Sequence, residues 1–303
     1  MQTSLAKKHD RSKMVLTIAF TVICIVYVLP IVIVLINSFK TNAAVNTDTF
    51  ALPNEDTFVG WQNYIKGMTF GNYPFIKAVF YSLFITLVSS ALILICTSMA
   101  AWYVARVGSL FSKIVYYLCV FSMVVPFQMV MFTLSRTANK LHLDTPWTIP
   151  VIYLGFGAGL AVFMFTGYMR SCPIAIEESA MIDGASQLRI FTSIVIPISK
   201  PLLATISLFL CFGYWNDWFL SSLYISKKNL ISLQALLNNI MRSLEYMTNN
   251  PTAGVSLQQY RAQMPSESVR MAIAIVIVIP IACAYPFFQK YFISGLTIGA
   301  VKG

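Results

Sequence analysis

Charge is scarce in this 303-residue chain, because Asp, Glu, Lys and Arg together make up only 11% of it. An average soluble domain has ~25% charged residues. Hydrophobic residues account for 57% of the chain, and the mean hydropathy is +0.72. Although the formal net charge is +10, no basic patch with interleaved aromatic residues indicates nucleic-acid binding. The composition excludes an ordinary soluble domain and predicts a membrane protein in contact with the lipid bilayer.

Residues that bind metals or form disulfides are also few. The chain has two histidines, His9 and His142, and six cysteines without a CxxC pair. Five of the cysteines lie in apolar stretches, where a thiol packs as a small apolar group. We therefore expect no metal site and no disulfide framework.

Motifs for covalent or phosphate chemistry are absent as well. The sequence has no GxxxxGK followed by Ser or Thr, so it does not bind ATP through a P-loop. It also has no nucleophile elbow and no HExxH motif. We expect no catalytic residue in this chain and no cofactor bound by it.

Long apolar runs are what the sequence has instead. Six of them approach or exceed the ~20 residues needed to cross a bilayer, and they cover residues 14–39, 78–105, 114–135, 145–169, 201–226 and 271–289. The first follows a basic terminus, as in a signal peptide, but it is longer than the roughly 7 to 15 apolar residues of such a peptide. We predict an all-α membrane protein with six transmembrane helices.

The basic N-terminus predicts a cytoplasmic start, and six crossings then return the C-terminus to the cytoplasm. On this scheme the chain has a cytoplasmic N-terminus, a transmembrane domain and a cytoplasmic tail, which are residues 1–13, 14–293 and 294–303. Two long connections, 40–77 and 227–270, lie outside the cell, and 170–200 forms a cytoplasmic segment.

The second outer connection contains a predicted amphipathic helix. Apolar residues recur at helical spacing from Leu233 to Met247. This apolar face rests either on the end of the membrane bundle or against a partner protein. The pattern alone favours the bundle.

The cytoplasmic segment predicts a short helix that starts near Pro173 and stops at Gly184. The spacing of apolar residues places Glu178 within the apolar stripe of this helix, so Glu178 is expected to have a partner. Glu177 and Asp183 are expected to be solvated.

A second short helix is predicted over residues 186–196, with Pro197 and Pro201 ending it. The alternative is a loop that lies flat on the lipid headgroups. The excess of acidic residues here argues against that alternative, because the headgroup surface is anionic.

Within the apolar runs, Asp217 is the clearest ionisable residue, and such residues are functional candidates because burying a charge is costly. Trp215, Asn216 and Asp217, together with Gln128, are candidates for a substrate path, since amides and carboxylates accept hydrogen bonds from sugar hydroxyls. Packing or an interfacial aromatic belt is the alternative, and the pattern favours it slightly.

The cytoplasmic segment resembles the EAA motif of ABC-importer permeases. Glu178-Ser179-Ala180 is followed after three residues by Gly184, and after nine more by Ile194-Val195-Ile196-Pro197. The spacing is complete, while Ser179 and Ile196 stand where the family has Ala and Leu. The segments WQNY at 61–64, WND at 215–217 and GLTIGAVKG at 295–303 resemble further parts of the family. The resemblance covers nearly the whole chain and is strongest to the maltose-permease-like branch of the carbohydrate-uptake family.

This resemblance implies a type I ABC importer permease of six transmembrane helices with cytoplasmic coupling helices, in a bacterial inner membrane. The coupling residues that dock on the ATPase would be Glu178, Ser179, Ala180, Asp183, Gly184 and Pro197, and Gly299, Lys302 and Gly303 would form an ATPase-contacting tail. The implied partners are a second permease subunit, two ATPase subunits that bind ATP and Mg, and an extracellular binding protein. The cargo would be a sugar, in particular an oligosaccharide.

Two alternatives remain open. One is an ABC permease for another polar solute, such as glycerol phosphate. The other is a stand-alone facilitator that works without an ATPase. A membrane-embedded enzyme is disfavoured, because the sequence lacks the nucleophile and metal ligands that one needs.

Overall fold

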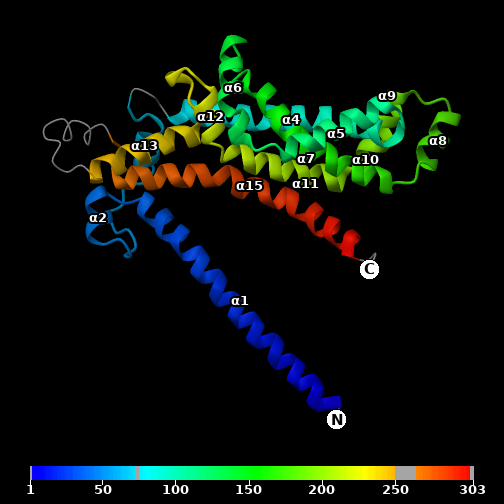
Figure 1. The fold of residues 1–303 in the computed structure, drawn as a ribbon. Helices are drawn as coiled ribbons and strands as arrows, with labels where there is room; N and C mark the ends of the chain where they lie inside the picture. The colour runs from blue at the N-terminus through cyan, green and yellow to red at the C-terminus, as the bar shows by residue number, and fades with distance from the viewer. Residues whose placement is uncertain (1, 72–74, 250–263, 301–303) are drawn as a thin grey trace. The chain divides into compact units, whose positions relative to one another are not determined.

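The computed structural model describes residues 2–71, 75–249 and 264–300 (Figure 1). Within these residues the regular elements are helices, and one isolated bridge pairs Lys40 with Phe58. The elements are α1 (Gln2–Ser38), α2 (Asn42–Thr47), α3 (Gln62–Met68), α4 (Phe75–Arg106), α5 (Leu110–Val124), α6 (Phe127–Lys140), α7 (Ile149–Ser171), α8 (Ala175–Ile182), α9 (Gln187–Ile190), the π-helix η1 (Phe191–Val195), α10 (Ile196–Ile198), α11 (Lys200–Trp215), α12 (Phe219–Tyr224), the 3-10 helix η2 (Lys228–Leu230), α13 (Leu233–Asn249) and α15 (Glu267–Ala300).

Four helices of the described chain are long and apolar enough to cross a bilayer. They are Lys13–Ser38, Phe75–Arg106, Ile149–Ser171 and Glu267–Gln289. Two further pairs pass the same test but are bent, so the chain has six spans if each bent pair counts as one. The prediction of an all-α membrane protein is confirmed, and the two remaining runs differ in shape from the prediction.

The third predicted run, residues 114–135, is not one straight helix. Its two halves, α5 and α6, meet at an angle of 107°. Pro126 stands at the break as the N-cap of α6. Proline disfavours the helical conformation of the residue before it, so Val125 adopts an extended backbone with ψ of 118°.

The fifth run also departs from the prediction. The apolar helix α11 ends at Trp215 rather than continuing to residue 226. The predicted helix over 186–196 does not stop at Pro197 but continues through η1 and α10 to Ile198, and a bend of 76° follows at Ser199. Pro197 lies in this continuous helix just after the π-helical turn η1, and the helix extends only one residue beyond it.

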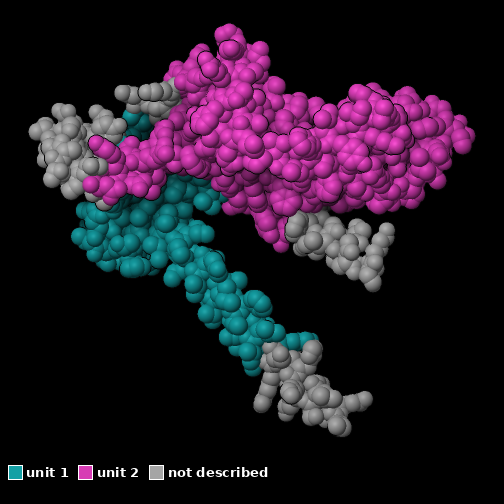
Figure 2. All heavy atoms as spheres, in the orientation of Figure 1, with its two compact units in different colours: residues 1–74, 254–280 teal, residues 75–253, 281–303 magenta. Residues whose placement is uncertain are grey.

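The chain divides into two compact units, residues 1–74 with 254–280 and residues 75–253 with 281–303 (Figure 2). In the first unit, hydrogen bonds from side chains satisfy backbone groups at the C-terminal end of α1. Asn63 Nδ2 donates to the carbonyl oxygens of Ser38 and Lys40 at 2.9 and 2.8 Å. Lys40 Nζ donates to the Asp48 carbonyl oxygen at 3.0 Å. These hydrogen bonds satisfy backbone carbonyl groups at or just after the C-terminal ends of α1 and α2. Asn63 belongs to the WQNY segment, which therefore has a structural role.

In the second unit, α4 packs along α7, and α5 and α11 pack on this pair. Buried apolar residues between them form the core, including Ile93, Val162, Phe165 and Ile206. The predicted amphipathic helix is present as α13 and contacts α4 and α12. Leu233, at the start of α13, is only 1% exposed. The first turn of α13 therefore rests on the bundle.

Two glycines of α7 allow its neighbours to approach closely. A Cβ atom added at Gly159 would lie 2.7 Å from the Cys119 carbonyl oxygen of α5 and 2.6 Å from Ser122 Oγ. At Gly157 it would lie 2.6 Å from Ile93 Cδ1 of α4. At Gly155 a Cβ would meet no atom within 4 Å. Gly157 and Gly159 thus serve packing, as small residues do between membrane helices.

We expect Gly159→Ala to destabilise the protein by about 1 to 3 kcal/mol, because the backbone of α5 must move to admit the methyl group. Gly155→Ala is the matched control and should leave stability unchanged or slightly higher, since alanine favours the helix. Thermal unfolding of both variants in detergent measures the difference. Equal melting temperatures would contradict the packing role of Gly159.

Candidate functional site

Residues 170–200 contain α8, whose end is formed as the sequence predicted. Gly184 has a positive φ of 79°, a conformation that glycine adopts without a steric penalty. Its N–H donates to the Met181 carbonyl oxygen at 3.0 Å, and the Ala185 N–H donates to the Ala180 carbonyl oxygen at 3.0 Å. This pair of bonds is a Schellman motif, which ends the helix and turns the chain toward α9.

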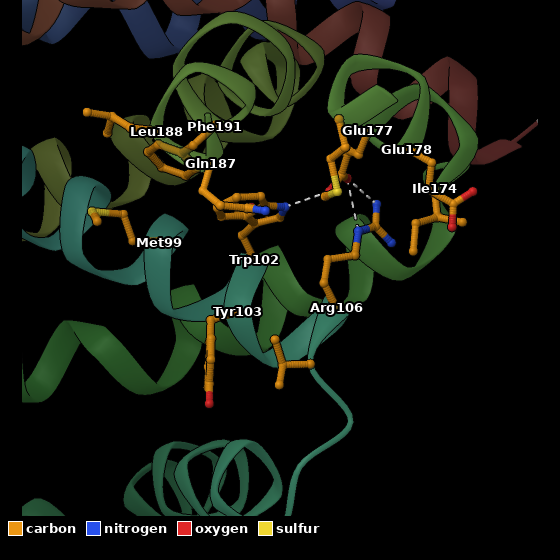
Figure 3. Close-up of a pocket in the computed structure, with 12 residues that line it drawn as sticks. Met99, Trp102, Tyr103, Arg106, Ile174, Glu177, Glu178, Gln187, Leu188 and Phe191 are labelled. Atoms are coloured by element: carbon orange, nitrogen blue, oxygen red, sulfur yellow. Dashed lines mark hydrogen bonds and ion pairs between the residues drawn. The ribbon is translucent and has the colours of Figure 1, made fainter. Parts of the chain in front are cut away.

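A buried carboxylate fixes α8 to the end of α4 (Figure 3). Glu177 Oε1 accepts hydrogen bonds from Arg106 Nε at 2.9 Å and from Arg106 Nη2 at 2.7 Å. Glu177 Oε2 accepts from Trp102 Nε1 at 2.8 Å. Glu177 is only 5% exposed. We call Trp102, Arg106 and Glu177 the anchor.

The surroundings of the anchor satisfy its buried charged and polar groups. A buried charge is costly unless it is paired and hydrogen-bonded, and here both carboxylate oxygens receive charged or polar donors. Arg106 also donates to the Cys172 carbonyl oxygen at 3.3 Å, so it holds the start of the segment as well. Its cation stands at the C-terminus of α4, where the helix dipole favours positive charge. Burial raises the pKa of the Cys172 thiol, which keeps it uncharged beside the pair.

The prediction that Glu178 is partnered and Glu177 solvated is wrong, because the structure reverses the two. Glu177 is the buried residue, and Glu178 is exposed. The sequence argument considered only neighbours within the short helix, whereas the decisive partner, Arg106, lies 71 residues away. A signal was nevertheless present, since Arg106 is a lone cation at the end of an apolar run.

The other predicted coupling residues divide between the two faces of the segment. Ala180 packs against a core cluster that contains Ile190 and Phe191. Ser179, Asp183 and Gly184 are exposed, as is Glu178. The apolar side chain of Ile182 is 86% exposed. One face of α8 is therefore packed against the rest of the protein. The other face exposes the Glu178 carboxylate and the apolar side chain of Ile182 on the surface of the chain.

A cavity of about 720 Å³ lies beside the anchor, between the end of α4 and the cytoplasmic segment (Figure 3). Its wall is mainly apolar, with Met99 and Trp102 from α4, Met181 from α8, and Phe191 from η1. The three anchor residues, Trp102, Arg106 and Glu177, also line this cavity.

The candidate substrate-path residues have structural partners. Asp217 Oδ1 accepts from the Leu220 N–H, and Oδ2 accepts from the Ser221 N–H, each at 3.0 Å. Asp217 Oδ2 also accepts from the Tyr153 hydroxyl. Asp217 thus caps α12 and ties it to α7.

The remaining path candidates lie on different surfaces. Trp215 is 3% exposed, whereas Asn216 is exposed and donates to the Phe212 carbonyl oxygen at 2.9 Å. Gln128 is exposed in the first turn of α6. Of the tail candidates, Gly299 lies in α15, and Lys302 and Gly303 lie outside the described residues.

Among the residues that the structure describes, no three His, Cys, Asp or Glu side chains are grouped so that they could hold a metal ion. The six cysteines, which all lie in this part, are unpaired.

Glu177→Ala is expected to destabilise the protein by on the order of 3 kcal/mol, because it leaves the Arg106 cation buried without a counter-charge. Glu178→Ala is the matched control and should leave the unfolding midpoint unchanged, since its side chain is exposed. Thermal unfolding of the two variants tests this. If Glu178→Ala proved the more destabilising change, the assignment of the anchor would be wrong.

Comparison with known proteins agrees with this architecture. Residues 93–298 match the family described as binding-protein-dependent transport system inner membrane component. The chain is 30% identical to the probable starch degradation products transport system permease protein AmyC of Thermoanaerobacterium thermosulfurigenes, over 98% of this chain and 99% of that protein. It is also 30% identical to the polygalacturonan/rhamnogalacturonan transport system permease protein YtcP of Bacillus subtilis, over 94% of each.

A solved structure has the same fold. It is a bacterial ABC transporter involved in the import of the acidic polysaccharide alginate, and it matches with a TM-score of 0.74 at 24% identity, over 92% of this chain and 95% of that one. The family match covers about two thirds of the sequence, and the AmyC match covers nearly all of it. The chain therefore belongs to the family of inner-membrane permease components of binding-protein-dependent transport systems.

Proposed function

We propose that this chain is the permease subunit of an ATP-driven importer for an oligosaccharide. The relatives named above are permease proteins of transport systems for starch degradation products and for polygalacturonan/rhamnogalacturonan. The alginate importer has the same fold. Similarity of this extent over the whole chain supports a carbohydrate cargo. The observation that carries the proposal is the cytoplasmic segment, which is anchored on one face and exposed on the other.

The exposed face of α8 is a suitable docking surface for an ATPase subunit. Glu178 offers an unburied carboxylate, and Ile182 offers apolar surface that is 86% exposed. A centre of apolar contact with a charged group at its rim is typical of protein interfaces. In this proposal Glu178, Ser179 and Asp183 contact the ATPase. Gly184 and Pro197 shape the backbone on either side of α9.

The topology follows from the same proposal. Residues 1–13 and 294–303 lie in the cytoplasm, and 14–293 form the membrane domain with the coupling segment 170–200 on the inner side. Connections 40–77 and 227–270 lie outside, where α13 meets the binding protein. The tail with Gly299, Lys302 and Gly303 reaches the ATPase interface.

The complete importer contains a second permease subunit, two ATPase subunits and an extracellular binding protein. ATP and Mg bind to the ATPase subunits, since this chain has no P-loop. Hydrolysis therefore takes place on the partners, and this chain converts their closure into movement of its helices. The apolar surface of α1 supports contact with lipid or with the second permease, because none of its most apolar window is buried within this chain.

The proposal is tested by purifying the tagged chain from its native membrane in mild detergent and identifying the copurified proteins by mass spectrometry. We expect a second permease and a P-loop ATPase in stoichiometric amounts. A transport-active chain purified alone would contradict the proposal and favour a facilitator. The solute bound to the binding protein tests the cargo, because an oligosaccharide supports the proposal and glycerol phosphate overturns that part of it.

The same purification tests the docking face. Glu178→Ala should reduce the recovered ATPase at least about tenfold, a loss of ~1.4 kcal/mol of docking free energy, while the second permease remains bound. Glu267→Ala is the control, because Glu267 is an exposed carboxylate paired only with Arg270 in the same turn at 3.1 Å. If both variants retained the ATPase equally, Glu178 would not be a docking residue.

A further inference from the structure

The helix α4 is a single unbroken element of 32 residues, which at 1.5 Å per residue is about 48 Å long. Figure 1 shows α13 at one end of α4 and α8 at the other. These two helices belong to the same compact unit as α4 but are separated from it in sequence. Each end of α4 makes a specific hydrogen-bonded connection to one of them.

At the inner end, the anchor connects α4 to α8. Three hydrogen bonds of 2.7 to 2.9 Å join Trp102 and Arg106 to the Glu177 carboxylate. The side chains of Arg106 and Glu177 are 14% and 6% exposed, so water competes little for the ion pair. A displacement of α8 is therefore transmitted to the last turn of α4.

At the outer end, Ser82 of α4 connects to the start of α13. Ser82 Oγ accepts a hydrogen bond from the Leu233 N–H at 2.8 Å. The first N–H groups of a helix have no acceptor within the helix, so Ser82 acts as a cap supplied by another element. Ser82, Leu233 and Ala235 are 3%, 1% and 0% exposed. The start of α13 is thereby fixed to α4.

Between its ends, α4 presents a series of small hydroxyl residues to its neighbours. Ser89 and Thr86 are 0% and 5% exposed, and neither hydroxyl oxygen has a hydrogen-bond partner. Small residues permit close approach of helices, and neither of these two hydroxyls ties α4 to α7 or α11. The Ser90 hydroxyl of α4 does accept a hydrogen bond from the Cys211 thiol of α11, at 3.7 Å. Ser82 and Arg106 are 24 residues apart, or about 36 Å, which exceeds the ~30 Å of a bilayer core.

We propose that α4 is the helix that transmits movement between the two sides of the membrane in this subunit. Contact of the binding protein at α13 and docking of the ATPase at α8 both act on the position of α4. Because coupling between two sites is reciprocal, each event favours the other. A continuous rigid element that both sites move is the physical requirement for such coupling. This inference rests on the proposed function.

The test uses the complete importer, reconstituted in lipid vesicles with the binding protein isolated together with its own solute. The quantity measured is the ratio of ATPase rates with and without the binding protein. Ser82→Ala removes the cap and should lower this ratio at least about fivefold, the lower end of typical couplings. Ser89→Ala is the matched control, since it makes the same change on the same helix at a hydroxyl without a partner.

At the inner end, Trp102→Phe removes one hydrogen bond to Glu177 while keeping an aromatic ring near Phe191, whose ring centroid lies 5.5 Å from that of Trp102. This variant should destabilise the protein less than a change at Glu177, because the ion pair between Arg106 and Glu177 remains. It should lower the ratio as well. The double variant, Ser82→Ala with Trp102→Phe, should be no worse than the more impaired single variant, because both changes interrupt the same connection.

Two results would overturn the inference alone. One is a ratio for Ser82→Ala equal to that of Ser89→Ala in an importer whose wild type is stimulated. The other is a double variant whose loss is the product of the two single losses, which indicates independent routes. A wild-type complex whose ATPase does not respond to the binding protein would overturn the proposed function and this inference with it.

Discussion

The buried ion pair between Arg106 and Glu177 determines how α8 is arranged relative to the end of α4. Charges are few in the chain, and this pair is almost completely removed from water. An unpaired charge there would cost several kcal/mol, so α8 is held in the one orientation that brings Glu177 to Arg106. The exposure of Glu178 and Ile182 follows from that orientation, because the next residues along a short helix point elsewhere.

The same principle explains two other charged groups of the chain, Asp217 and Lys40. Asp217 lies in an apolar stretch and was a candidate for substrate contact, but its oxygens cap α12 and accept from Tyr153. Lys40 is 1% exposed, and its ammonium group donates to the Asp48 carbonyl oxygen just after α2. In both cases a buried polar group has a partner within the protein, as the cost of desolvation requires. Such groups fix the ends and breaks of helices in this chain.

Sequence reasoning predicted the features that depend on local chemistry. The length of apolar runs identified the membrane helices, and Gly184 marked the end of α8 because the turn needs a positive φ. The EAA spacing predicts a coupling role for residues 170–200, and this role stays a prediction. The bends at Pro126 and Ser199 were missed, since an apolar run has the same composition whether it is straight or bent. The roles of Glu177 and Glu178 were exchanged because the deciding contact is with Arg106, which is distant in sequence.

In the importer that we propose, α8 and the end of α4 move as one body during transport. A cryo-electron microscopy structure of the whole importer, determined both without nucleotide and with ATP trapped on the ATPase, tests it most directly. We predict that the guanidinium of Arg106 stays within hydrogen-bonding distance of the Glu177 carboxylate in both states, while α4 shifts relative to α7. Separation of Arg106 from Glu177 in either state would contradict the account.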